Sequence, residues 1–227
     1  MLYLVATPIG NLKDITLRAL EILKSADLIA CEDTRRTGQL LKHYEIEKKM
    51  VSFHEHSGPG RVREIISLLK EDRNVALVSD GGTPLISDPG FPLVREAVRE
   101  KIPVEAVPGP SVVVAAVAVS GLPAEPFTFF GFLSAKSTRR KKELREVAGL
   151  EHTLVFFESP YRLLTALSDF FEILGDREAA VCRELTKKFE ETVRGRLTEI
   201  RKHFAKGKIL GEIVIVVAGK DRKPVFQ

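Results

Sequence analysis

The sequence predicts an α/β protein made of two α/β domains, the first with a mainly parallel sheet and the second with a mixed sheet. The first observation is the alternation of short apolar strands with helical patterns along the first half of the chain, which is typical of a parallel sheet. The second is a stretch rich in proline and glycine at residues 121–126, which is the best candidate for a linker. We therefore expect an N-terminal domain over residues 1–120 and a basic C-terminal domain over residues 121–227.

Five apolar runs in the first half predict strands, over residues 2–6, 28–31, 51–53, 75–78 and 104–107. Apolar residues at helical spacing predict helices between them, around residues 17–23, 62–69 and 94–98, and a further helix over residues 112–120. Asp14, Asp88 with the following Pro89, and Ser111 are the expected caps.

The second half predicts strands over residues 127–132, 153–157 and 213–217, with a hairpin made of residues 179–185 and 191–197. Helices are expected around residues 164–174, ended by Gly175, and around residues 197–204. Because this half combines a hairpin with strands that are followed by helices, its sheet is expected to be mixed.

Composition limits the class of protein. The chain has 227 residues, of which 44% are hydrophobic, so it can bury a sizeable core. Its longest apolar candidate, residues 112–119, is far shorter than the roughly 20 residues that cross a bilayer, and the first strand follows Met1 without a signal-peptide pattern. Cys31 and Cys182 form no Cys-x-x-Cys pair, which favours a reduced compartment. We expect a cytoplasmic protein with no membrane partner.

The net charge of +4 is unevenly distributed along the chain. Residues 1–115 hold 15 Lys and Arg against 16 Asp and Glu, a balance of −1, whereas residues 116–227 hold 20 against 15, a balance of +5. A basic second half points to a polyanionic partner, although many basic surfaces bind nothing.

The loop after the strand at residues 75–78 is the main candidate for a ligand site. It reads Ser79-Asp80-Gly81-Gly82-Thr83-Pro84, and its glycines can adopt positive φ and let a ligand approach the backbone. Ligands in open α/β sheets bind at the carboxyl ends of strands, where this loop lies. A strand followed by Asp-Gly-Gly is also commonly a plain turn. The loop matches neither the dinucleotide fingerprint nor the Walker loop.

Three other polar segments follow predicted strands. Glu32, Asp33, Arg35 and Arg36 follow the second strand, and such charged loop residues are often merely solvated. His54 and His56 follow the third strand but lack further ligands at a recognisable spacing, so we expect no metal site and interpret them as substrate contacts or a plain loop. The densest basic run follows the strand at residues 127–132 and is interpreted either as a phosphate contact or as a solvated helix start. It contains Lys136, Arg139, Arg140, Lys141 and Lys142.

Taken together, four segments resemble the tetrapyrrole methylase superfamily over essentially the whole chain. They are Ser79-Asp80-Gly81-Gly82-Thr83-Pro84, Val107-Pro108-Gly109-Pro110-Ser111, Glu32-Asp33-Thr34-Arg35-Arg36 and Phe156-Phe157-Glu158-Ser159-Pro160. The resemblance implies two α/β domains with S-adenosylmethionine in the cleft between them, and a homodimer. Within the superfamily the chain is most similar to the small-subunit ribosomal RNA methyltransferases. This implies 2′-O-methylation of a cytidine in 16S ribosomal RNA, with that RNA or the 30S subunit as partner.

Two alternatives stay open. Porphyrin and corrin precursor methylases of this superfamily open with Gly-x-Gly-Pro-Gly, whereas this chain has Ala6-Thr7-Pro8-Ile9-Gly10, which makes a tetrapyrrole substrate the weaker expectation. A tetrapyrrole-precursor C-methylase therefore remains the first alternative. The second is a catalytically silent RNA-binding module that has kept the fold.

The resemblance also assigns residues to the site. The cofactor residues are Pro8, Ile9, Asp80, Gly82, Thr83, Pro84, Ser111, Val112 and Phe157. A ribose hydroxyl is a weak acid, so a positioned base helps to remove its proton, and the sequence does not rank the candidates Glu32, Asp33, His54 and Glu158. The residues expected to contact RNA phosphates are Arg35, Arg36, Lys136, Arg139, Arg140 and Lys141.

Overall fold

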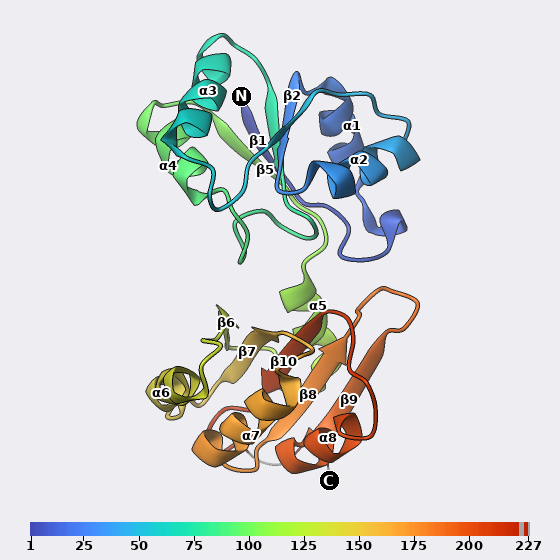
Figure 1. Cartoon of the computed structure of the whole chain (residues 1–227), viewed down its shortest axis with the longest axis vertical. Helices are drawn as coiled ribbons and strands as arrows, with labels where there is room; N and C mark the ends of the chain where they lie inside the picture. The colour runs from blue at the N-terminus through green and yellow to red at the C-terminus, as the bar shows by residue number, and fades with distance from the viewer. Residues whose placement is uncertain (223–224, 227) are drawn as a thin grey trace. The chain divides into compact units, whose positions relative to one another are not determined.

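The computed structural model describes residues 1–222 and 225–226 and divides the chain into two compact units, Met1–Ser111 and Val112–Gln227. Each unit contains one five-stranded sheet with helices packed on its faces (Figure 1). The expected pair of α/β domains is therefore confirmed.

The sheet of the first unit is parallel throughout, with the strand order β3-β2-β4-β1-β5. Its strands are β1 Leu2–Val5, β2 Leu28–Cys31, β3 Met50–Ser52, β4 Val75–Val78 and β5 Val104–Val107. β2 and β4 are buried along their whole length, as expected for central strands of a sheet that is covered on both faces.

Helices cover both faces of this sheet. They are α1 Leu17–Ser25, α2 Thr34–His43, α3 Pro59–Lys70 and α4 Phe91–Arg99. Leu77 of β4 packs in one apolar cluster with α3 and α4, and Val78 packs in another with α1 and α2. The chain thus leaves β1 on one face and leaves the adjacent strand β4 on the other. The carboxyl ends of β1 and β4 therefore form the topological switch point at which open α/β sheets bind ligands.

Two helices of this unit begin later than the sequence indicated. α1 is capped by Thr16, whose Oγ1 accepts a hydrogen bond from the N–H of Ala19 at 3.1 Å, while Asp14 ends a separate 3₁₀ helix, Leu12–Asp14. α4 begins after Gly90, which has φ of +143°, and Asp88 lies before this turn. Several short polar residues precede each helix, and tertiary packing decides which of them lies at the first turn.

The sheet of the second unit has the order β6-β7-β10-β8-β9. Its strands are β6 Phe127–Phe132, β7 Thr153–Glu158, β8 Glu178–Arg183, β9 Glu191–Arg196 and β10 Ile213–Val217. β6 and β7 are parallel, whereas the remaining pairs are antiparallel. The predicted mixed sheet and the predicted hairpin, β8 with β9, are both present.

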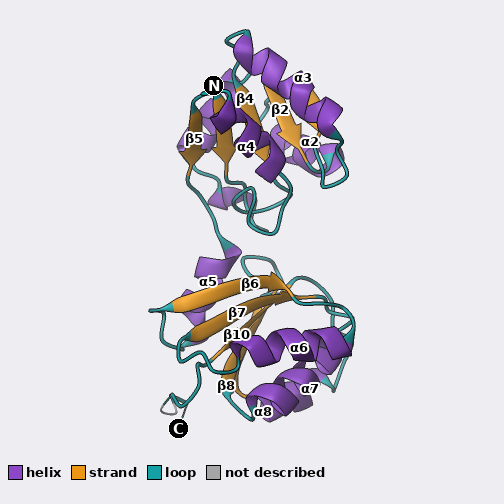
Figure 2. Ribbon diagram, turned by 90° about the vertical axis from the view of Figure 1, so that its left-hand side faces the viewer, coloured by secondary structure: helices purple, strands orange, loops and turns teal. Residues whose placement is uncertain are grey.

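The helices of this unit are α5 Val112–Ser120, α6 Ser137–Val147, α7 Leu163–Leu174 and α8 Leu197–Phe204. Figure 2 shows α6, α7 and α8 on one face of the sheet and α5 on the other. β7 serves both faces, since Phe156 packs toward α7 while Val155 and Phe157 pack toward α5. No helix within residues 1–222 is long and apolar enough to span a membrane.

α5 belongs to the second unit, because its Val113, Ala116 and Val117 pack with Cys182 of β8 and Val214 of β10. The boundary between the two units lies between residues 111 and 112 of the sequence, whereas the composition of the chain suggests a boundary after residue 120. The proline- and glycine-rich stretch at residues 121–126 connects α5 to β6 inside the second unit. Loop composition marks a turn but does not say onto which sheet the preceding helix folds.

Candidate cofactor and RNA site

The loops that follow β1 and β4 are joined directly to each other. The backbone N–H and C=O of Thr7 bond to the C=O and N–H of Gly82, both at 2.9 Å. The Thr7 hydroxyl also donates to the carbonyl of Ser79 at 3.2 Å, and the Ser79 hydroxyl donates to the carbonyl of Gly82 at 3.3 Å. The switch point is thus a bonded platform rather than two independent turns.

Glycines at this platform allow close approach between backbones. A Cβ added at Gly109, after β5, would lie 2.9 Å from the Cβ of Ala6, and one added at Gly81 would lie 3.2 Å from the carbonyl oxygen of Pro8. Gly82 has φ of +89°, a conformation that side chains disfavour. These glycines therefore hold the loops after β1, β4 and β5 against one another. The sequence predicts that the glycines after β4 let a ligand approach the backbone. Close contact between the loops is a second role of these glycines.

The cofactor residues assigned in the first unit differ in accessibility. Those that are buried, and so shape the loops, are Pro8, Gly82 and Pro84. Those that reach solvent, partly or fully, are Ile9, Asp80 and Thr83. A ligand above the platform therefore has the side chains of the second group most open to it.

Asp33 is the N-cap of α2, a helix that occupies part of a segment that the sequence predicts as a loop. Its carboxylate caps the helix by accepting from the N–H of Arg35 at 2.8 Å, and it binds the guanidinium of the same residue at 3.1 and 2.7 Å. These bonds to Arg35 hold the pKa of Asp33 well below its usual range. A carboxylate so stabilised in its charged form is a poor base, and Arg35 is already paired.

Asp80 links the central loop to α2. Its Oδ1 accepts from the backbone N–H of Asp33 at 3.1 Å, and its Oδ2 lies 3.4 Å from Nη1 of Arg36. Both side chains keep exposed surface, with 23% of Asp80 and 62% of Arg36 accessible. The ends of β2 and β4 are therefore connected by a charged pair that solvent or a ligand can reach.

Glu32 lies beside this pair at the end of β2. Partial burial raises the pKa of Glu32, the charge of Asp80 raises it further, and the nearby Arg36 and His54 oppose the shift. A carboxylate with a raised pKa accepts a proton more readily than an ordinary glutamate. Glu32 thus has a property that a general base requires, in a group that remains partly accessible.

The histidines that follow β3 are exposed. The rings of His54 and His56 are 6.2 Å apart, and the backbone N–H of His54 bonds to the hydroxyl of Ser57 at 2.9 Å. Across residues 1–222 and 225–226, no three His, Cys, Asp or Glu side chains are grouped so as to hold a metal ion.

The remaining assigned cofactor residues are divided between the units. Ser111 ends the first unit, Val112 begins α5 in the second, and Phe157 lies near the end of β7. The ring of Phe157 packs edge-on against Phe129 at 4.7 Å and Phe132 at 5.4 Å between centroids. Phe157 is therefore part of an aromatic group on the face of the second sheet that carries α5.

Glu158, at the end of β7, is buried and already has partners. Its Oε1 accepts from the N–H of Ser159 at 2.7 Å and forms an ion pair with Nη2 of Arg162, 2.8 Å away. The side chain of Glu158 is 2% exposed, and Nε of Arg162 is buried without a partner. This geometry is that of a structural ion pair, and it leaves little freedom for Glu158 to accept a substrate proton.

The basic run on α6 is only partly available to a ligand. Arg140 is buried and binds Asp169 of α7 through Nε at 2.8 Å and Nη2 at 2.6 Å, so its assignment to the RNA surface is corrected. Lys141 lies 2.5 Å from Glu172, which largely neutralises it. The residues of this run that remain exposed, with no ion pair among the described residues, are Lys136, Arg139 and Lys142.

Sequence reasoning missed three residues that build these sites. Thr7 carries the bridge between the loops, Gly109 lets the third loop approach, and Arg162 neutralises Glu158. Only Arg162 had a readable signal, because it follows Glu158 by four residues, so the two opposite charges are near each other along the chain. The contacts of Thr7 and Gly109 join segments that are far apart in the sequence.

Known structures share this fold. Uroporphyrin-III C-methyltransferase from Thermus thermophilus aligns with a TM-score of 0.67 and 22% identity over 96% of this chain and 94% of that chain. A further structure of that enzyme, described as complexed with S-adenyl homocysteine, aligns with a TM-score of 0.66 over 96% and 97% of the two chains. Diphthine synthase aligns with a TM-score of 0.70 and 18% identity, over 96% and 90%.

Sequence relatives are much closer. A protein of Thermotoga maritima is 52% identical over 220 residues, which covers 97% of this chain and 99% of the relative. One of Halalkalibacterium halodurans is 48% identical over 98% of this chain and 77% of its own length. Both are named ribosomal RNA small subunit methyltransferase I. A family model described as tetrapyrrole (corrin/porphyrin) methylases matches residues 1–201. The chain therefore belongs to the tetrapyrrole (corrin/porphyrin) methylase family.

Proposed function

We propose that this protein transfers a methyl group from S-adenosylmethionine to the ribose 2′-oxygen of a cytidine in 16S ribosomal RNA. The observation that carries the proposal is the 52% identity, over nearly the full length of both chains, to a ribosomal RNA small subunit methyltransferase I. The joined loops at the switch point of the first sheet and the basic second half are consistent with it.

The residues at the switch point suit such a cofactor. Its sulfonium and amino groups are cationic, and Asp80 offers a partly exposed carboxylate at the loop where ligands bind. Ile9 and Thr83 are accessible beside it and provide an apolar and a hydroxyl contact. When bound, S-adenosylmethionine supplies a methyl group whose bond to sulfur breaks as its bond to the ribose oxygen forms. The protein's task is to orient the acceptor and exclude water.

Among the candidate bases, we propose Glu32 as the group that takes the hydroxyl proton. Its pKa is raised, whereas that of Asp33 is lowered and Glu158 is held in a buried ion pair. His54 stays a second candidate, since it is exposed close enough to Glu32 to influence its charge. A base of this kind typically contributes 10² to 10⁴ in rate.

The exposed cations at the start of α6 are proposed to contact RNA phosphates, namely Lys136, Arg139 and Lys142. Arg36, beside Asp80 in the first unit, is proposed to do the same. Arg35 and Lys141 are weaker members of this set because each already binds a carboxylate. We further propose a cytoplasmic homodimer, as the family resemblance implies, and sedimentation of the purified protein at micromolar concentration tests that state.

The test is transfer of a labelled methyl group to three substrates: isolated 30S subunits, free 16S ribosomal RNA and a tetrapyrrole precursor. Label in either RNA substrate and none in the tetrapyrrole supports the proposal. Label in the tetrapyrrole alone identifies a precursor methylase, and label in none of them, with RNA still bound, identifies a silent binding module. The Glu32→Gln variant should still bind S-adenosylmethionine in calorimetry while its turnover falls at least 100-fold.

A further inference from the structure

We propose that the second unit carries another RNA-binding surface, formed by α8, the loop that follows it and the tip of the β8–β9 hairpin. This inference rests on the proposed function, since it names where the same RNA substrate is held. The surface, called here the hairpin surface, consists of Lys188, Phe189, Arg201, Lys202, Lys206 and Lys208. It is separate from the basic run on α6.

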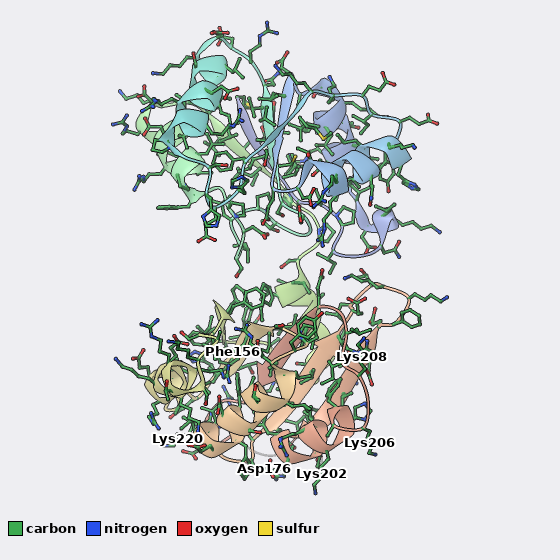
Figure 3. All side chains as sticks on the ribbon, viewed as in Figure 1. Phe156, Asp176, Lys202, Lys206, Lys208 and Lys220 are labelled. Atoms are coloured by element: carbon green, nitrogen blue, oxygen red, sulfur yellow. The ribbon has the colours of Figure 1, made fainter. Side chains whose placement is uncertain are left out.

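The parts of the hairpin surface are held together by specific bonds. Lys187, at the hairpin tip, lies 3.1 Å from the carboxylate of Glu212, which ends the loop that follows α8. Nη1 of Arg183 donates to the carbonyl of Leu210 in the same loop at 3.3 Å. These contacts place the hairpin next to Leu210 and Glu212, at the far end of the loop that begins with Lys206 and Lys208. Figure 3 shows Lys202, Lys206 and Lys208 along this side of the unit.

His203 completes the connection between α8 and the hairpin. Its Nε2 lies 2.8 Å from Oε1 of Glu191, at the start of β9, and the same carboxylate binds Nε of Arg183 at 2.9 Å. The end of α8 is therefore bonded to the start of β9, which adjoins the hairpin tip.

The charges on this surface divide into two groups. Arg183 pairs with Glu191 across the hairpin, and Lys187 pairs with Glu184 in the hairpin and with Glu212 in the loop. The ring of His203 bonds to Glu191. In contrast, Lys188 and the four cations from Arg201 to Lys208 are exposed and, within the described part of the chain, form no ion pair. Arg201 and Lys202 lie in the last turn of α8, where they also favour the helix dipole. Lys206 and Lys208 lie beyond the helix, so the dipole does not account for them.

Phe189 adds a feature that a purely structural patch does not need. Its side chain is 66% exposed at the tip of the hairpin, and the ammonium group of Lys188 lies 5.5 Å from the centre of its ring. An exposed aromatic ring beside free lysines is the combination with which proteins stack unpaired bases while contacting the phosphate backbone. We assign the cations to phosphates and the ring of Phe189 to an unstacked base.

The first test removes the two lysines that lie outside the helix. The double variant Lys206→Ala, Lys208→Ala is compared with a matched double variant of the first unit, Lys24→Ala, Lys49→Ala, whose lysines are also exposed. Binding to a 16S ribosomal RNA transcript is measured by filter retention across a salt series. We expect the first variant to bind roughly 30-fold more weakly at about 0.1 M salt and to lower the salt slope by about 1.4 to 1.8, whereas the control matches the wild type.

The second test removes the ring. Phe189→Ala is compared with Phe91→Ala, because Phe91 is 63% exposed and also has a cation, Arg95, 5.6 Å from its ring centre. Loss of base stacking should weaken RNA binding by about 5- to 150-fold for Phe189→Ala and leave the salt slope unchanged. The Phe91 variant should bind as the wild type does. All four variants change exposed side chains, and their melting temperatures are compared to verify folding.

The outcomes separate this inference from the proposed function. Wild-type protein that binds RNA, with both hairpin-surface variants unaffected, overturns the inference and leaves the proposed function standing. A change in sedimentation coefficient without a change in RNA affinity assigns the surface to contact between two copies of the chain, which also overturns it. Wild-type protein that neither binds nor methylates the RNA refutes the proposed function itself.

Discussion

Replacing Arg140 with methionine removes a buried cation from between α6 and α7. Nε of the guanidinium donates to Oδ2 of Asp169 at 2.8 Å, and Nη2 forms an ion pair with the same oxygen at 2.6 Å. Its Nη1 also donates to the carbonyl oxygens of Ser134 and Ala135, at 3.2 and 3.3 Å. Methionine has a similar shape but donates no hydrogen bond, so the buried carboxylate of Asp169 loses its main partner.

The remaining partners of Asp169 set the size of the effect. Breaking a buried ion pair from one side costs about 3 to 5 kcal/mol. Asp169 keeps the hydroxyl of Ser137 at 2.9 Å and the ammonium of Lys141 at 3.6 Å, so we expect the lower end, about 3 kcal/mol. With an unfolding entropy of about 2.1 cal/mol/K per residue, this lowers the melting temperature by about 6 °C if the whole chain unfolds together. The decrease is about 12 °C if the second unit unfolds alone.

Calorimetry on Arg140→Met and on the adjacent variant Arg139→Met measures this difference. Arg139 is exposed and forms no ion pair among the described residues, so its replacement should change the melting temperature by about 1 °C or less. In the RNA-binding assay, by contrast, Arg139→Met should have the larger effect. Arg139→Met should lower the salt slope of binding by about 0.7 to 0.9, whereas folded Arg140→Met should leave it unchanged.

Equal melting temperatures for the two variants would refute this reasoning, as would a lower salt slope for Arg140→Met. The double variant Arg140→Met, Asp169→Leu removes both charges and should recover most of the lost stability. Failure to recover would assign the cost to packing instead of the unpaired carboxylate.

Further predictions concern the first site and the end of β7. Gly109→Ala, whose new methyl group meets the Cβ of Ala6, should weaken S-adenosylmethionine binding in calorimetry by about tenfold, while Gly60→Ala, in open space on α3, should not. The acidic limb of the pH–rate profile should disappear in Glu32→Gln and move to lower pH in Asp80→Asn, because the charge of Asp80 raises the pKa of Glu32. A limb that stays in place would remove Glu32 from the reaction. Glu158→Gln should lower the melting temperature but keep turnover per folded molecule within about threefold; a loss of turnover near 100-fold would restore it as a base.

The strands were predictable because burial on both faces leaves continuous apolar runs, such as those of β4 and β10. The central loop was predictable as well, because a strand end followed by Asp80 and two glycines is a local pattern. Helix starts were less so, since Thr16 rather than Asp14 caps α1 and only the packing of that helix decides between them.

The available and the buried cations of α6 could not be told apart in the basic run. Arg140 lies four residues before Leu144, and both are on the buried stripe of the helix, but a row of adjacent Lys and Arg residues hides that periodicity. The partner that fixes Arg140, Asp169, is 29 residues away. In the same way, the bridge between Thr7 and Gly82 joins loops that no local pattern connects.

The hairpin surface illustrates the converse case. Lys206 and Lys208 flank Gly207 after a helix, where basic residues are ordinary, and Phe189 is one of 13 phenylalanines in the chain. Their significance depends on which neighbouring cations already have carboxylate partners, and only the contacts of Arg183 with Glu191 and of Lys187 with Glu212 reveal that.

The most direct measurement is nucleoside mass spectrometry of 16S ribosomal RNA after incubation of 30S subunits with the protein and deuterated S-adenosylmethionine. We predict label in 2′-O-methylcytidine, which forms at least 100-fold more slowly when Glu32→Gln replaces the wild-type protein. Label on a cytosine base, or no label in the RNA from the wild-type reaction, would contradict the account.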